Sequence, residues 1–97
     1  MTTTTQASRM LTEPWALSAS VSLRPEPFGA LAYNFANRKL TFLKRPQLVR
    51  LVEHLGDHPD VASALAAEDI PSAQTESYLA ALGALAQTEI IRPRNDA

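Results

Sequence analysis

VSLRPEPFGALAYNFANRKLTFLK, residues 21–44, is the stretch that decides the fold, because it contains most of three short predicted strands. The first predicted strand covers residues 17–24, where apolar and polar residues alternate and place one dry face against a core. Pro25 and Pro27 lack an amide hydrogen, so strand pairing is expected to break or bend there. The second strand is then predicted at residues 28–35.

A turn and a third strand complete the predicted sheet. The turn contains the sequence NFANR, residues 34–38, and its two asparagines tolerate left-handed backbone angles. The third strand, residues 39–43, returns along the second and is predicted to leave one edge of the sheet open. Leu40 and Phe42 point to one face of this strand and the other three side chains to the opposite face. Whether Phe42 belongs to the core or to a groove is left open by this pattern.

Three helices are predicted to follow the sheet. Apolar residues at helical spacing place them at residues 46–55, 59–67 and 72–88, with Ser72 available as the N-cap of the third. Strands followed by helices indicate an α+β domain, in which the helices cover one face of a small three-stranded antiparallel sheet. This arrangement is also winged helix-turn-helix-like.

The chain length of 97 residues predicts a single domain. We expect this domain at residues 14–94, preceded by a flexible polar tail at residues 1–13 and followed by a frayed end at residues 95–97. There is no secretory signal pattern and no apolar run of the roughly 20 residues needed to span a bilayer. These features predict a cytoplasmic protein without a membrane partner.

Several kinds of catalytic site are excluded or disfavoured by the residue types present. The chain has no cysteine, which excludes thiolate zinc sites, protein-held iron–sulfur clusters and cysteine nucleophiles. His54 and His58 have the spacing of a zinc pair, but Gly56 interrupts the helix between them and no third ligand pattern follows. No glycine-rich phosphate loop and no Gly-x-Ser-x-Gly elbow occurs. We therefore expect neither an enzyme nor a bound cofactor or metal.

DNA binding is the alternative function that a winged fold suggests, as in a transcription regulator. A recognition helix needs arginine or lysine for phosphates and guanine edges. The third predicted helix, residues 72–88, has neither, and the net charge of the chain is −1. The sequence therefore disfavours nucleic acid as a partner.

Basic residues gather instead around the third strand, at Arg38, Lys39, Lys44, Arg45 and Arg50. They suit a charged margin that discourages edge-to-edge aggregation, and equally an edge that accepts an acidic extended peptide. In the second interpretation the peptide lies in a groove between residues 39–43 and an exposed flank of residues 78–85. The candidate peptide-binding residues are Arg38, Lys39, Leu40, Thr41, Phe42, Leu43, Lys44, Arg45, Tyr78, Ala81, Leu82 and Leu85.

Four runs of sequence resemble a known family. They are SLRPEPFGALAY at residues 22–33, NRKLTFL at 37–43, YLAAL at 78–82 and IIRPR at 90–94, and they resemble the peptide chaperones of mycofactocin biosynthesis. The resemblance covers roughly residues 15–94. It implies the fold of the chaperone of pyrroloquinoline quinone biosynthesis (PqqD-like), with three strands and three helices.

The resemblance also implies a function without catalysis by this chain. Such chaperones bind the acidic leader of a short ribosomal precursor peptide and present its C-terminal Val-Tyr end to a radical S-adenosylmethionine maturase. That enzyme carries the iron–sulfur clusters. In related recognition elements the leader adds to the third strand beside the third helix, which corresponds here to residues 39–43 and 78–85.

Overall fold

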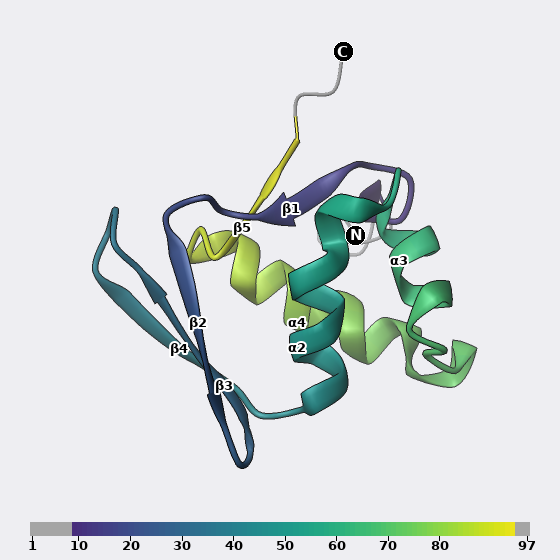
Figure 1. Cartoon of the computed structure of the whole chain (residues 1–97). Coiled ribbons are helices and arrows are strands. Elements are labelled where there is room, and N and C mark those ends of the chain that lie inside the picture. Colours follow the sequence, from purple (N-terminus) through teal and green to yellow (C-terminus); the bar gives the residue numbers. More distant parts are fainter. Residues whose placement is uncertain (1–8, 95–97) are drawn as a thin grey trace.

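A three-stranded antiparallel sheet lies on one side of the molecule and the helices lie on the other, in the computed structural model, which describes residues 9–94 (Figure 1). The sheet contains β2 (Val21–Glu26), β3 (Gly29–Asn34) and β4 (Lys39–Leu43) in the order β2-β3-β4. The predicted bounds of the third strand are confirmed by β4. Because β3 is central, β2 and β4 are the two edges of this sheet.

The expected break occurs at Pro27, which lies in the turn after β2, and not at Pro25. The β2–β3 ladder continues through Pro25, which lies opposite Ala30, to Glu26 opposite Gly29. Since β2 is an edge strand, the missing amide hydrogen of a proline is tolerated there. Gly29 has a φ of 151°, and a Cβ at this position would collide with the carbonyl oxygen of Leu43 in β4. The hairpin therefore depends on a glycine at this close approach.

The first predicted strand is two strands separated by a turn. β1 (Trp15–Leu17) leaves the main sheet and pairs antiparallel with β5 (Ile91–Pro93). The turn between β1 and β2 contains Ser18, which is buried and whose backbone N–H donates to the carbonyl of Ile90 at 2.9 Å. Alternation of apolar and polar residues continues across this turn, so the alternation alone did not reveal the break.

The first two helices lie close to their predicted positions. α2 (Pro46–His54) begins with a proline at its first turn and continues into the 3₁₀ helix η1 (Leu55–Asp57). α3 (Val61–Ala67) is capped by Asp60, whose carboxylate accepts from the backbone N–H of Ser63 at 2.8 Å. This hydrogen bond from Ser63 lowers the pKa of Asp60.

The third helix begins later than expected. Ser72 opens a 3₁₀ helix, η2 (Ser72–Gln74), and α4 (Thr75–Gln87) follows it. Gln74, and not Ser72, is the N-cap of α4, and its side chain makes no capping hydrogen bond. The prediction of Ser72 as the cap of the long helix is therefore wrong.

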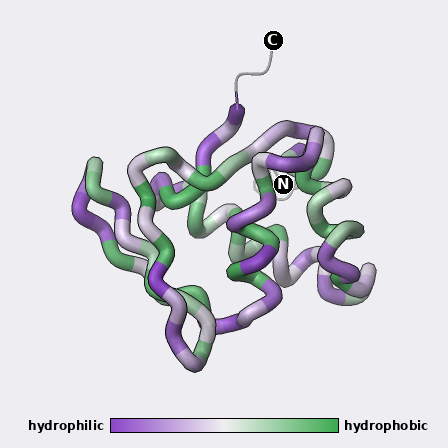
Figure 2. The backbone as a smooth tube through the Cα atoms, viewed as in Figure 1, coloured by the Kyte–Doolittle hydropathy of each residue, from purple (hydrophilic) through white to green (hydrophobic). Residues whose placement is uncertain are grey.

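The hydrophobic core lies between the helices and the inner face of the sheet. Figure 2 shows hydrophobic segments interspersed with hydrophilic ones along α2 and α4, as expected for helices with one buried face. Met10 is also part of this core, with 4% of its surface exposed, although it falls in the predicted tail. Residues 1–8 and 95–97 of the predicted tail and frayed end lie outside the described residues. The largest fully buried apolar side chains are Leu43, Leu51, Val52, Leu55, Val61, Tyr78, Leu82, Ile90 and Ile91.

Two neighbouring residues of β4 should differ strongly in their effect on stability. Phe42 is 55% exposed and Leu43 is 1% exposed. We expect Leu43→Ala to lower the free energy of unfolding by about 2–5 kcal/mol because it leaves a cavity. Phe42→Ala should cost only about 1 kcal/mol, since it loses a ring contact with Phe28 but leaves no buried cavity. Urea unfolding followed by circular dichroism would measure both, and an equal loss would contradict the placement of Phe42 outside the core.

Candidate peptide-binding site

β4 is an open edge that runs beside α4. Its pairing partner is β3, and within residues 9–94 no strand lies along its other side. Two side-chain contacts hold α4 alongside this edge. Nη1 of Arg45, just beyond β4, donates to Oγ of Ser77 at 3.3 Å, and Nδ2 of Asn37, just before β4, donates to the carbonyl of Thr88 at 3.1 Å. The helix therefore runs antiparallel to the strand and is tied to it at both ends.

Arg45 also contacts an aromatic ring at its end of the site. Its guanidinium carbon lies 4.3 Å from the centre of the Tyr78 ring, a cation–π contact. The same side chain thus joins the end of β4 to the first turn of α4 in two ways. Arg45 was predicted as a ligand-binding cation, but in this structure it is a link between strand and helix.

The flank of α4 between the two ties consists of small residues. Ser77, Ala81, Ala84 and Thr88 recur at intervals of four, three and four residues, which places them on one side of a helix. All four are exposed or half-buried. Small side chains here leave room for a peptide backbone to approach the helix closely.

Three of the four α4 residues predicted to line the groove lie in the core instead. Tyr78, Leu82 and Leu85 are 2%, 0% and 4% exposed, so they belong to the core and form no exposed flank. Ala81 is half-buried and lies on the β4 side, so it is the predicted α4 residue that faces the site. Helical spacing located the apolar face correctly, but this face is turned into the protein.

The side chains of β4 divide between its two faces as predicted. Leu40 and Phe42 are 56% and 55% exposed on the outer face, away from the helices. Thr41 is half-buried on the inner face, and the side chain of Leu43 is buried in the core. Phe42, which the sequence left open, is outside the core. A peptide beside β4 would therefore meet Leu40 and Phe42 on one side and the small flank of α4 on the other.

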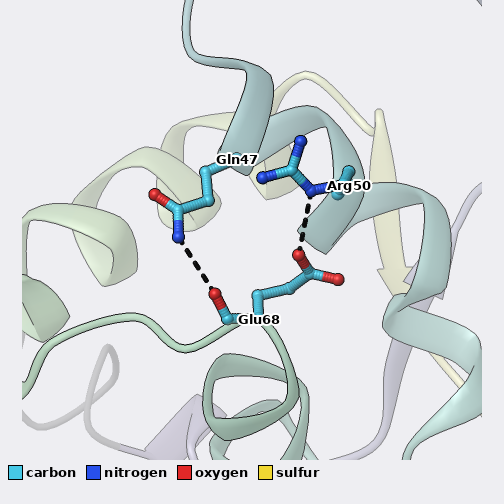
Figure 3. A network of polar contacts seen from close by, with 3 residues as sticks. All are labelled: Gln47, Arg50 and Glu68. Carbon is cyan, nitrogen blue, oxygen red and sulfur yellow. Dashed lines mark hydrogen bonds and ion pairs between the residues drawn. The ribbon is translucent and has the colours of Figure 1, made fainter.

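The predicted basic cluster separates into two groups. Arg38, Lys39 and Lys44 are exposed, and none takes part in a salt bridge among the residues described. Arg50 instead points towards α3, where its Nε lies 3.2 Å from Oε1 of Glu68 (Figure 3). Gln47 donates to the carbonyl of the same Glu68 at 3.0 Å, so Arg50 helps to join α2 to the end of α3. The cations available at the open edge are therefore Arg38, Lys39 and Lys44.

The turn before β4 uses its asparagines in an unexpected way. The left-handed residue is Arg38, with a φ of 61°, and not an asparagine. Oδ1 of Asn37 accepts from the backbone N–H of Lys39 at 3.0 Å, while its Nδ2 reaches α4. The Asn37 side chain therefore both closes the turn and fixes the helix, a double role that the sequence alone did not indicate.

A hollow of about 670 Å³ lies on the other flank of α4 and was not predicted. It is lined by α4 residues that include Leu79 and Gly83, and by the segment from Arg9 to Trp15. No residue of β4 lines it, but Ala84 of the small flank does, so the hollow and the flank beside β4 meet at this residue. The sequence did not reveal it, because residues 9–13 were interpreted as a flexible tail.

Other classes of site are not visible in the part of the chain that the structure describes. Among residues 9–94 there is no group of three or more histidine, aspartate or glutamate side chains that could hold a metal ion. Nδ1 of His54 lies 3.1 Å from Oδ2 of Asp57, within a short turn. No helix in this range is long and apolar enough to cross a membrane.

The fold and the open edge define a class: a small α+β domain, consistent with the PqqD-like fold, whose edge strand lies open beside a helix. The peptide chaperone MftB family matches residues 14–92, and the chain belongs to this family. The family is not catalytic, so the chain is not an enzyme.

Three curated relatives are each named peptide chaperone MftB. The chain is 49% identical over 81 residues to the one from Mycolicibacterium smegmatis, covering 84% of this chain and 79% of the relative. It is 46% and 42% identical over 80 residues to those from Mycobacterium ulcerans and Mycobacterium tuberculosis, covering 82% of this chain and 73% of each relative. No solved structure matches the chain.

Removing the Arg45 link should destabilise the fold more than removing a neighbouring cation. We expect Arg45→Ala to lower the free energy of unfolding by about 1 kcal/mol, since it removes one hydrogen bond and one cation–π contact. The matched control is Lys44→Ala, which should change stability by less than about 0.5 kcal/mol because Lys44 is exposed. Chemical denaturation would compare the two. Equal stabilities would show that Arg45 does not hold α4 against β4.

Proposed function

We propose that the chain binds the acidic leader of a ribosomally made precursor peptide as an added strand on β4, and delivers it to a radical S-adenosylmethionine maturase. The observation that carries this proposal is the open edge of β4, with α4 tied alongside it by Arg45 and Asn37. The names of the relatives, peptide chaperones, support a peptide as the ligand. Edge-strand addition is a recurring way in which domains bind extended peptides.

Backbone pairing with β4 alone does not supply enough free energy to bind a flexible peptide. β4 has five residues, so an added strand can form only a few backbone hydrogen bonds, each worth about 0.5–1.5 kcal/mol net. Ordering a flexible peptide consumes much of this gain. Leu40 and Phe42 offer exposed apolar surface beside the added strand, and Ala81 and Ala84 offer a close-packing flank. Apolar contacts on both sides of the peptide therefore supply the rest of the affinity.

Charge supports an acidic ligand. Arg38 and Lys39 lie at the start of β4 and Lys44 lies just beyond its end, and all three are exposed. Surface charges of this kind mainly raise the rate of association with an oppositely charged partner. The same residues also discourage pairing between the edges of two copies, so the two roles of the basic cluster are compatible.

The chemistry itself is assigned to the maturase. The chain has no cysteine and therefore offers no thiolate ligand for an iron–sulfur cluster. Its part in the reaction is to hold and orient the substrate peptide. Location in the cytoplasm, where such a maturase would be met, stays a prediction.

The alternative of a winged-helix transcription regulator has less support. α4, the longest helix, contains no arginine or lysine, and α3 contains none either. Contacts to DNA phosphates depend on such residues. No observation on residues 9–94 favours nucleic acid over a peptide as the ligand.

Filling the space beside α4 should weaken peptide binding. We expect Ala81→Leu to raise the dissociation constant of a synthetic acidic leader peptide by about tenfold, because the larger side chain occupies the position of the peptide backbone. Ala80→Leu is the matched control, since Ala80 is exposed on the other flank of the same helix and lines the hollow there. Isothermal titration would measure both variants. Equal affinities would exclude the β4–α4 groove as the binding site.

Reversing a charge at the open edge should slow association. We expect Lys39→Glu to lower the association rate of the leader several-fold at low ionic strength. The difference should vanish at about 1 M salt, where the screening length is about 3 Å. Arg92→Glu, an exposed reversal on β5, is the control and should have a much smaller effect. Stopped-flow measurement with a fluorescent leader would test this, and similar rates for both variants would argue against electrostatic capture at β4.

A further inference from the structure

The face of the sheet that points away from the helices is apolar and uncovered. Six side chains form it, here named the outer patch: Phe28, Leu31, Tyr33, Phe35, Leu40 and Phe42. The exposed large hydrophobic residues of the described chain are Phe28, Phe35, Leu40 and Phe42, and all four belong to this patch. None of the six residues packs in the hydrophobic core. In Figure 1 no helix lies on this side of the sheet.

The outer patch is continuous across β3, β4 and their turns. Leu31 lies opposite Phe42, and Tyr33 lies opposite Leu40, so two neighbouring rows of apolar side chains stand on one face. Each row ends in an aromatic contact. The ring centres of Phe28 and Phe42 are 5.9 Å apart, and those of Tyr33 and Phe35 are 5.1 Å apart, both edge to face. Figure 2 shows the hydrophobic tip of the β3–β4 hairpin at this margin.

The charges on this face cancel. Arg24 and Glu26 lie on the same side of β2, and Nε of Arg24 is 3.2 Å from Oε2 of Glu26. The outer patch therefore favours an apolar partner surface and not a strongly charged one. This distinguishes it from the basic edge of β4, which suits an acidic peptide.

The size of the patch limits what can cover it. With strands of about six residues at about 3.3 Å per residue and a strand spacing of about 4.8 Å, the sheet face covers about 300 Å². A stable protein interface buries about 800 Å² on each partner. A second copy seated on this face alone would therefore form too small an interface for a stable dimer. A contact of this size suits the apolar centre of a transient interface that extends onto neighbouring surface.

We infer that the outer patch is the surface on which the peptide-modifying enzyme docks, through an apolar surface of its own. This inference rests on the proposed function. β4 belongs to both sites, because its edge is open to the peptide while Leu40 and Phe42 contribute to the patch. An enzyme on the patch would thus also touch the peptide held beside β4, and its interface would be larger when the peptide is bound.

The test uses a double variant that avoids β4. Phe28→Ser with Phe35→Ser removes two exposed rings from the patch. Phe28 contacts Phe42, which the proposed peptide would meet, whereas Phe35 contacts Tyr33 of β3. The control is Ala66→Ser with Ala73→Ser, two exposed positions on α3 and η2. Phe35→Ser alone is a milder second variant in case the double variant unfolds, which thermal denaturation would reveal. Association with the maturase and with a fluorescent leader would be measured separately for each variant.

The expected result is selective. The double variant should bind the maturase at least about tenfold more weakly, and Phe35→Ser alone should weaken it by a smaller but measurable factor. Phe35→Ser should bind the leader as the parent does, and the control should match the parent in both assays. If the patch variants bind the maturase as tightly as the parent, the inference is wrong.

Two further outcomes separate this inference from its rivals. If the parent protein dimerises in sedimentation, while the patch variants are monomeric and still bind the maturase normally, the patch is the contact with a second copy. This result would overturn the inference. If the parent protein does not bind the leader, and the patch variants bind the maturase more weakly than the parent does, the proposed function is refuted and the docking surface is supported.

Discussion

One carbonyl oxygen, that of Glu89, joins the parts of this fold that are far apart in sequence. It accepts from Oγ of Ser18 at 2.7 Å and from Nδ2 of Asn34 at 2.9 Å. Oδ1 of Asn34 accepts in turn from Oγ of Ser20 and from the backbone N–H of Ala36. Asn34 is 1% exposed, so losing its bond to the Glu89 carbonyl would leave its Nδ2 buried without that acceptor, at a cost of about 1–3 kcal/mol.

This network sets the position of the open edge. Asn34 is the last residue of β3, and Glu89 follows the C-terminal end of α4 with a left-handed φ of 64°. The bond between them brings the end of the helix to the β3–β4 turn, where Asn37 adds the second contact. α4 can then lie along β4 without a strand between them. The open edge is therefore a result of buried hydrogen bonding as much as of the sheet itself.

The strands and helices that have a clear pattern of apolar residues were predicted from the sequence. Alternation located β4, and apolar spacing with Pro46 located α2. The pairing of β1 with β5 escaped prediction, because two three-residue strands more than 70 residues apart carry almost no pattern of their own. The orientation of α4 escaped for another reason. Helical spacing located its apolar face, but most of the helix is leucine and alanine, and the sequence alone does not show whether that face turns to the core or to β4.

The small residues along α4 have a consequence for the choice of cargo. Ser77, Ala81, Ala84 and Thr88 place only small side chains on the flank of α4 that faces β4. Backbone pairing with β4 is likewise indifferent to side-chain identity. Under the proposed function, such a surface would select a peptide by its extended shape and overall charge, and would tolerate substitutions at single positions. The proposed function then implies that leader sequences could drift during evolution without loss of their carrier. Joining a foreign core peptide behind a similar acidic leader would then be a practical route to new substrates.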